Sequence, residues 1–82
     1  MSYELTKHAR ERMEERTISK ELIEEALRNP TKVWYDEDGR ILIKKLYKKK
    51  DKERLLLIIG EKANGKLKII TIIETSKIKK YL

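Results

Sequence analysis

The sequence predicts a small α+β domain in which an N-terminal helix hairpin packs on a four-stranded antiparallel sheet, followed by a short C-terminal tail. Apolar residues recur at helical spacing up to Asn29-Pro30 and alternate with a period of two after it. Two turn signals, Asp38-Gly39 and Asn64-Gly65, favour hairpins between the later strands. The chain has 82 residues and no repeat or linker, so we expect one domain spanning residues 1–82.

Two helices are expected, at residues 7–16 and 20–28. Thr6 and Ser19 precede them and are suitable N-caps, because a hydroxyl oxygen can accept a hydrogen bond from a free backbone N–H of the first turn. The second helix should end at Asn29-Pro30, since proline disfavours a helical conformation of the residue before it. Its apolar face is formed by Leu22, Ile23, Ala26 and Leu27.

Four strands are expected after the helices, at residues 32–37, 41–47, 54–60 and 67–74, with the lysine run between the second and third strands as a loop. The last two strands are apolar on both faces, so both faces of the sheet need a cover. The helices can cover one face. The other face needs the tail, residues 76–82, or a second subunit, and we therefore expect a docked tail or a homodimer.

The composition excludes several classes of protein. There is no cysteine and a single histidine, which argues against disulfides and against a metal site, and no cofactor motif is present. No apolar run reaches the ~18 residues of a membrane span, and the first residues are polar, so we expect a cytoplasmic protein without a membrane partner. Abundant lysine, glutamate and isoleucine, with no glutamine, resemble thermophile usage.

The positive charge is concentrated in the second half of the chain. Residues 1–28 carry six basic and seven acidic side chains, whereas residues 29–82 carry fifteen basic and seven acidic ones, which together give the net charge of +7. A basic half suggests a polyanionic partner, with nucleic acid first and an acidic protein second. The alternative is a solvated lysine-rich surface without a partner.

A column of three cationic residue types runs along the first helix. His8, Arg12 and Arg16 are spaced four apart and therefore stack on one side, although two like charges at this spacing cost about 0.2–0.5 kcal/mol. A helical wheel places both arginines beside the apolar stripe, so we expect them to be at least partly buried. They can pair with an internal carboxylate, such as Glu74 or the chain terminus, or they can form the wall of an anion site.

The chain resembles a small family of domains of unknown function that is placed near the RelE/ParE and BrnT toxins of toxin–antitoxin systems. The resemblance rests on the H-x-x-x-R-x-x-x-R helix, the Asn29-Pro30 helix end, Gly39-Arg40 and the T-S-K-x-x-K-Y segment at residues 75–81. Thr17 is a departure, because glycine is expected there, and it suggests a slightly different turn between the helices. The resemblance implies a RelE-like fold and an antitoxin protein as partner.

It also implies metal-independent cleavage of RNA, either free or bound to the ribosome. In that reaction a 2′-hydroxyl attacks the neighbouring phosphate while a base, an acid and cations assist. The candidate catalytic residues are His8, Arg12, Arg16 and Tyr81, with Tyr81 or Trp34 available to stack a base. Candidate nucleic-acid-binding residues are Arg40, Lys45, Lys48, Lys49, Lys50, Arg54, Lys77 and Lys80.

Each of these candidates also has a structural explanation. His8 can be an ordinary helix residue, and Trp34 can belong to the core or to a subunit interface. The alternative to an endoribonuclease is therefore a non-catalytic basic module of the toxin fold that binds a protein partner or nucleic acid. The two hypotheses differ in geometry, because catalysis requires His8, an arginine and a further cation to converge on one open concave surface.

Overall fold

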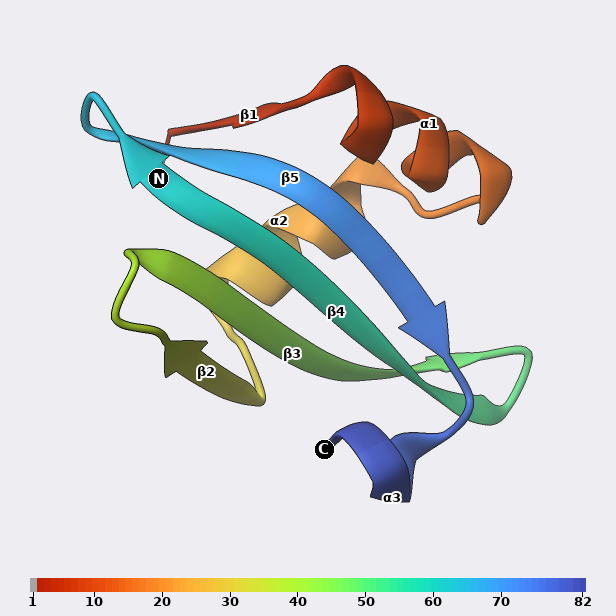
Figure 1. Ribbon diagram of the computed structural model, residues 1–82. Coiled ribbons are helices and arrows are strands. Elements are labelled where there is room, and N and C mark those ends of the chain that lie inside the picture. The colour runs from red at the N-terminus through yellow and green to blue at the C-terminus, as the bar shows by residue number, and fades with distance from the viewer. Residues whose placement is uncertain (1) are drawn as a thin grey trace.

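Two helices lie against one face of a five-stranded sheet and a short third helix lies on the other face, as the computed structural model shows for residues 2–82 (Figure 1). In chain order the elements are β1 (Tyr3–Leu5), α1 (Lys7–Glu15), α2 (Lys20–Arg28), β2 (Lys32–Tyr35), β3 (Arg40–Lys49), β4 (Lys52–Ala63), β5 (Lys66–Thr75) and α3 (Ile78–Tyr81).

The sheet has the order β1-β5-β4-β3-β2, in which β2 to β5 form the expected antiparallel meander. The prediction of a four-stranded, purely antiparallel sheet is wrong, because β1 adds a fifth strand that runs parallel to β5, with Tyr3 opposite Leu67. Three residues are too few to show an alternating pattern. Backbone hydrogen bonds hold the strand instead, including one from the Thr6 N–H to the Ile69 carbonyl oxygen at 3.0 Å.

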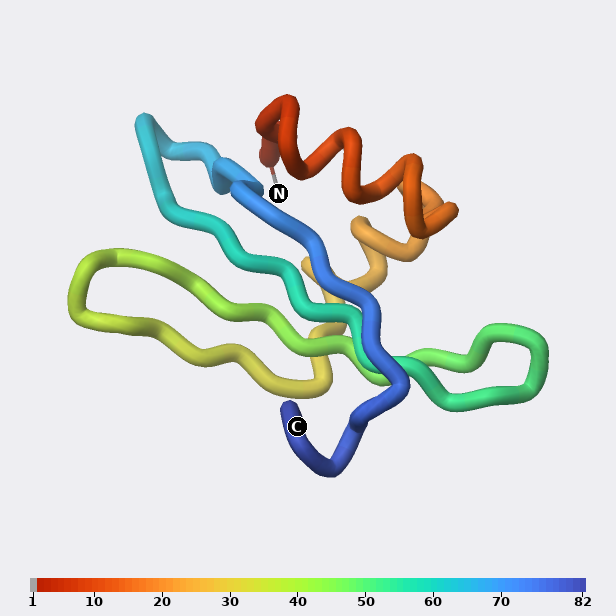
Figure 2. The backbone as a smooth tube through the Cα atoms, turned by 45° about the vertical axis from the view of Figure 1, so that its right-hand side comes forward, coloured from red at the N-terminus to blue at the C-terminus, as the bar shows by residue number. Residues whose placement is uncertain are grey.

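The lysine run that was expected to be a loop forms the end of a long hairpin. β3 and β4 stay paired as far as Lys49 and Lys52, and the two-residue turn, Lys50-Asp51, has φ angles of 53° and 65°. Two positive φ angles are typical of a type I′ turn, which matches the twist of the strands that it joins. Residues 47–54, here called the basic hairpin, extend past the end of β5, where Thr75 pairs with Leu55 (Figure 2).

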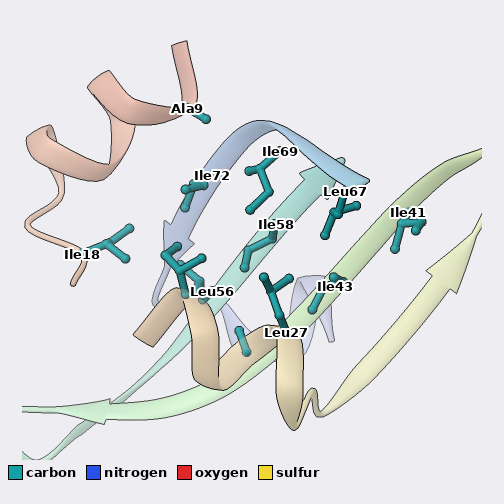
Figure 3. Close-up of a cluster of buried hydrophobic side chains, with 12 residues drawn as sticks. Ala9, Ile18, Leu27, Ile41, Ile43, Leu56, Ile58, Leu67, Ile69 and Ile72 are labelled. Atoms are coloured by element: carbon teal, nitrogen blue, oxygen red, sulfur yellow. The ribbon is translucent and has the colours of Figure 1, made fainter. Parts of the chain in front are cut away.

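The core lies between the helices and one face of the sheet, here called the helix face (Figure 3). Ile58 at the centre of β4 is fully buried, and its neighbours in register are Ile43 and Ile72. The predicted apolar face of α2 contributes directly, since Ile23, Ala26 and Leu27 are buried. Among the described residues this cluster consists of Ala9, Ile18, Ile23, Ala26, Leu27, Ile41, Ile43, Leu56, Ile58, Leu67, Ile69 and Ile72.

The opposite face of the sheet, here called the second face, is only partly covered. Leu55 and Leu57 on β4 are buried there, and the C-terminal segment containing α3 is tied down by the Lys44 Nζ, which donates to the Tyr81 carbonyl oxygen at 2.6 Å. The tail thus docks on this face, as one of the two expected covers. Trp34 and Ile73 remain 60% and 38% exposed.

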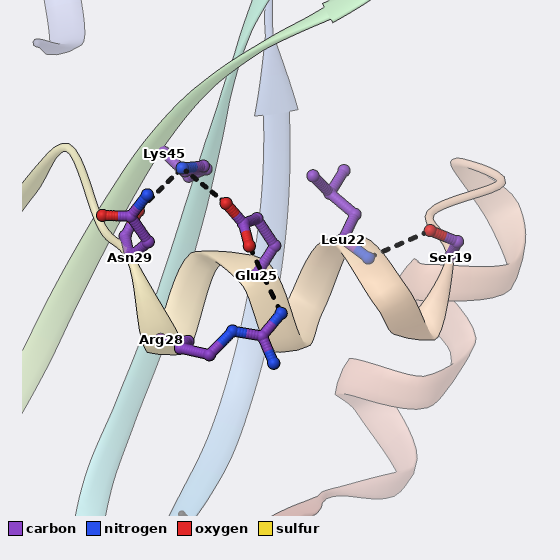
Figure 4. Close-up of polar contacts among 6 residues, drawn as sticks. All are labelled: Ser19, Leu22, Glu25, Arg28, Asn29 and Lys45. Carbon is purple, nitrogen blue, oxygen red and sulfur yellow. Dashed lines mark hydrogen bonds and ion pairs between the residues drawn. The ribbon is translucent and has the colours of Figure 1, made fainter.

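Both predicted N-caps are confirmed. The Thr6 Oγ1 accepts the Ala9 N–H at 3.1 Å and donates to the Ile70 carbonyl oxygen at 3.0 Å, so one hydroxyl caps α1 and ties it to β5. The Ser19 Oγ accepts the Leu22 N–H at 3.1 Å (Figure 4). α2 ends at Arg28, before Asn29-Pro30, as predicted.

Thr17 adopts the backbone geometry that glycine usually provides at a helix end. Its φ is 53°, its N–H donates to the Glu14 carbonyl oxygen, and the Ile18 N–H donates to the Met13 carbonyl oxygen at 2.9 Å. This pair of bonds defines a Schellman motif, with Ile18 and Met13 packed in the core as its apolar contact. The expectation that threonine alters the turn is therefore wrong: the turn is kept and Thr17 is strained.

Replacing Thr17 by glycine should raise the free energy of unfolding by about 1 kcal/mol, because a side chain in the left-handed region costs about 1–2 kcal/mol and glycine loses more entropy on folding. Urea denaturation measures the change. Thr17→Ala keeps the Cβ atom and serves as the matched control, with a smaller gain. A Thr17→Gly variant less stable than the parent would contradict the left-handed assignment.

Candidate functional site

The column on α1 meets β5 at the edge of the helix face. His8 is exposed, and its Nε2 lies 3.0 Å from the Thr71 Oγ1. Arg12 has a side chain that is 37% exposed and lies 3.9 Å from the Glu15 carboxylate, while its Nε is buried without a hydrogen-bond partner among residues 2–82. Arg16 follows the helix as its C-cap and is exposed. The predicted partial burial therefore holds for Arg12 and not for Arg16.

The carboxylate of Glu74 joins β5 to the basic hairpin and to the end of α1. It accepts the Tyr47 hydroxyl and lies 3.6 Å from the Lys49 Nζ, which also donates to the Arg16 carbonyl oxygen at 3.3 Å. Burial raises the pKa of Glu74, and the positive charge of Arg16 partly opposes that rise. Within residues 2–82 the ion-pair partner of Glu74 is therefore Lys49. Arg12 pairs with Glu15 instead, and Arg16 acts on Glu74 through its charge alone.

A shallow pocket of about 290 Å³ opens beside Glu74, between the turn that joins α1 to α2 and the base of the basic hairpin. Its lining includes Thr17, Ser19, Tyr47, Lys49 and Glu74. The pocket does not suit a phosphate group, because the Glu74 carboxylate would repel it when ionised and already pairs with the nearest lysine.

Lys45 and Arg40 do not join the other cations. The Lys45 side chain is mostly buried, and its Nζ lies 2.7 Å from the Asn29 carbonyl oxygen and 3.5 Å from the Glu25 carboxylate (Figure 4). The Arg28 hydrogen bond to Glu25, together with Lys45, lowers the pKa of Glu25. Lys45 therefore anchors α2 on β3. Arg40 begins β3, at the end remote from the basic hairpin.

The remaining predicted cations lie on the basic hairpin or in the tail. Lys48 and Lys50 are exposed, and Arg54, opposite Tyr47 in register, is half-buried with its Nε unpartnered within the described chain. Lys52, which was not among the predicted binding residues, is also exposed. Its membership of the lysine run was the signal that could have found it. Lys77 and Lys80 are exposed in the tail.

Tyr81 is not brought near His8. Its carbonyl oxygen binds Lys44 on β3, and the Lys80 Nζ lies 5.3 Å from its ring centroid. Figure 1 shows α1 and α3 on opposite sides of the sheet. Thr71, the partner of His8, was missed by sequence reasoning, because a single threonine in a strand carries no signal of a contact with a helix 63 residues away.

These features define a small basic α+β domain whose lysines gather on a projecting hairpin. The model of the family described as "Domain of unknown function (DUF4258)" matches residues 5–74, from the end of β1 to near the end of β5, and the chain belongs to this family. No curated protein and no solved structure matches the chain. The expected membership in a family of unknown function is confirmed, and the relation to toxins stays a prediction.

No group of three or more histidine, cysteine, aspartate or glutamate side chains in residues 2–82 could hold a metal ion. No helix in the same range is long and apolar enough to cross a membrane.

Proposed function

We propose that this protein is a basic RNA-binding module that contacts the phosphate backbone of single-stranded RNA through the basic hairpin. The observation that supports this most directly is the projection of residues 47–54 beyond the sheet (Figure 2). This segment contains four lysines and one arginine against two acidic residues, a net charge of +3. Lys48, Lys50 and Lys52 are exposed and make no ion pair within the described residues.

The geometry of the basic hairpin suits backbone contact better than base recognition. In a two-stranded ribbon, neighbouring side chains point to opposite faces, so lysines are presented on both sides of it. Its one aromatic residue, Tyr47, is half-buried and donates its hydroxyl to Glu74, which leaves no exposed ring in the ribbon to stack on a base. Lysine contacts to phosphate carry affinity and no sequence information.

The relation to RelE/ParE and BrnT toxins is part of the same proposal. In that setting the RNA is free or ribosome-bound, and an antitoxin protein regulates the domain. Lys49 and Glu74 then serve to hold the hairpin on the body of the fold, since the Lys49 Nζ contacts both the Arg16 carbonyl oxygen at the end of α1 and the Glu74 carboxylate.

Binding to a fluorescent single-stranded RNA should weaken steeply with salt, because each neutralised phosphate adds about −0.7 to the slope of log K against log salt. Replacing Lys48, Lys50 and Lys52 together by alanine should make that slope shallower by about 2, since up to three contacts are lost. Fluorescence anisotropy across a salt series measures both quantities. Lys49 is left in place because of its contact with Glu74.

The matched control removes three other exposed lysines, Lys62, Lys66 and Lys68, around the β4–β5 turn at the far end of the sheet. It changes the net charge of the protein by the same amount and should leave most of the salt slope intact. Equal losses for the two triple variants would mean that net charge alone drives binding. No binding of the parent at low salt would reject the proposal.

Metal-independent cleavage of RNA is a second candidate function, favoured by the accessibility of His8. Its imidazole is exposed one helical turn from Arg12, whose side chain is 37% exposed and forms a long ion pair with Glu15 at 3.9 Å that a phosphate can replace. In this scheme the imidazole takes the proton of the 2′-hydroxyl or gives one to the leaving 5′-oxygen, and the guanidinium stabilises the charge of the phosphorane-like transition state.

A further inference from the structure

The free edge of the sheet at β2 is apolar and open. β2 is the last strand in the sheet order, and all four of its residues are exposed. Three of them are large and apolar: Val33, Trp34 and Tyr35 are 40%, 60% and 64% exposed. Natural proteins usually protect such an edge with charges, proline or a covering element, because unpaired N–H and C=O groups are a template for another strand.

The direction of the unpaired backbone groups follows from the ladder with β3. The Asp36 N–H donates to the Arg40 carbonyl oxygen at 3.0 Å, and pairing in an antiparallel ladder alternates along the strand. Trp34 therefore directs its N–H and C=O toward β3. Val33 and Tyr35, on either side of it, direct theirs away from the sheet, where they can form a second ladder.

Charge along this edge is opposite at its two ends. Lys32 begins β2, with Lys44 beside it on β3, whereas Asp36, Glu37 and Asp38 follow the strand directly. The acidic end disfavours a nucleic-acid strand, because its carboxylates repel phosphate. An edge that is basic at one end and acidic at the other is complementary to itself when a twofold axis reverses it, as the isologous contact of a C2 dimer requires.

We infer that two copies of this chain pair along β2 as antiparallel strands and form one continuous sheet across a twofold axis. The register that matches both the outward backbone groups and the charges places Trp34 opposite the partner's Trp34. Val33 then lies opposite the partner's Tyr35, and Lys32 opposite the partner's Asp36. A shift of two residues in one direction would place Lys32 against the partner's Trp34 ring. A shift of two residues in the other direction would place it against the partner's Asp38, which lies in the turn beyond the end of β2.

Apolar contact is available on both faces of this strand pair. On the second face the two Trp34 rings meet at the twofold axis, where a non-hydrogen-bonded pair brings side chains closest. On the helix face, Val33 and Tyr35 line an apolar pocket of about 260 Å³ together with Leu27 and Ile43. The partner's Tyr35 beside Val33 extends that lining. The basic hairpin lies at the other end of β3 and stays free, so this inference is independent of RNA binding.

The chain carries its own probe for the contact, because Trp34 is its single tryptophan. Sedimentation of the full chain at rising concentration should show a monomer–dimer equilibrium, and tryptophan emission should shift to the blue over the same range. The contact is small, so we expect reversible association. A monomer at all concentrations, or a blue shift that appears only when RNA is added to a monomer, would overturn the inference.

Substitutions at the edge distinguish strand pairing from non-specific hydrophobic association. Val33→Pro removes an outward N–H without removing a bond to β3, and it should weaken dimerisation about tenfold or more while Val33→Thr retains it. Lys32→Glu should also weaken it. Because the Lys32 Nζ donates to the Leu82 carbonyl oxygen at 3.0 Å, its control is Lys44→Glu, which breaks the neighbouring tail contact with the Tyr81 carbonyl oxygen and should weaken dimerisation less. If Val33→Pro fails to fold by circular dichroism, Lys32→Glu against Lys44→Glu decides.

Cysteine cross-linking tests the register, since the parent has no cysteine. Facing residues in a non-hydrogen-bonded pair have Cβ atoms about 4.5–5.5 Å apart, close enough for a disulfide after a small adjustment. Trp34→Cys should therefore form a disulfide-linked dimer under mild oxidation, and Val33→Cys should do so much more slowly. The reverse order of rates would overturn the proposed register, and equal slow rates would overturn pairing along β2.

Discussion

Truncation of Ile58 to alanine should lower the free energy of unfolding by about 2–5 kcal/mol, the range for deleting a fully buried isoleucine side chain and leaving a cavity. Ile58 is 0% exposed and lies in the middle of the sheet, between Ile43 and Ile72 in register. A domain of this length has a total stability of only about 4–12 kcal/mol. The variant should therefore unfold at a clearly lower urea concentration than the parent.

Ile73→Ala is the matched control for this prediction. It removes the same atoms from a neighbouring strand, but Ile73 is 38% exposed on the second face. Its truncation should cost about 1 kcal/mol or less, because little buried contact is lost and no closed cavity forms. Urea denaturation of both variants, followed by circular dichroism, gives the comparison. Equal losses of unfolding free energy in the two variants would contradict the location of the core between the helices and the helix face.

The elements with strong local signals were predictable from the sequence. The two helices, both hydroxyl caps and the end of α2 at Asn29-Pro30 follow from hydrogen-bonding chemistry within a few residues. The turn at Asn64-Gly65 is likewise confirmed, with φ angles of 52° and 75°. In each case the residues that decide the conformation adjoin the segment that adopts it.

The elements that depend on distant partners were not predictable. β1 forms because it pairs with β5, which follows more than 60 residues later in the chain. The residues Tyr3–Leu5 themselves contain no pattern that predicts this pairing. The lysine run was expected to be a loop. In the structure, β3 and β4 extend through it as far as Lys49 and Lys52, because each strand provides the hydrogen-bonding partner of the other. Thr17 shows the same limit, since tertiary packing of Ile18 outweighs the local preference for glycine.

The residues of the candidate site were also only partly predictable from the sequence. The sequence offered Glu74 as an internal carboxylate for the arginine column, but the ion pair that Glu74 forms is with Lys49. It did not separate Lys45, which anchors α2 through Asn29 and Glu25, from the exposed lysines of the basic hairpin. That distinction requires knowing that β3 passes beneath the end of α2, which only the assembled fold provides.

If the protein cleaves RNA, His8→Ala should lower the rate of cleavage by about 10²–10⁴-fold, the usual contribution of a positioned acid or base. The same substitution should change RNA affinity little, because His8 contributes no more than one contact beside a hairpin of charge +3. Single-turnover cleavage in the presence of EDTA, with anisotropy for binding, separates the two quantities. The fold should survive, since His8 is exposed and its side-chain hydrogen bond within residues 2–82 is to Thr71.

His8→Gln sharpens this test, because the amide can keep the hydrogen bond to the Thr71 hydroxyl but cannot transfer a proton near neutral pH. Loss of cleavage in both His8 variants, with activity retained in Thr71→Ala, would assign proton transfer to the imidazole. Cleavage by His8→Gln at the parental rate would limit the role of the histidine to its hydrogen bond. Absence of metal-independent cleavage by the parent would leave RNA binding as the function and limit His8 to a structural contact between α1 and Thr71 on β5.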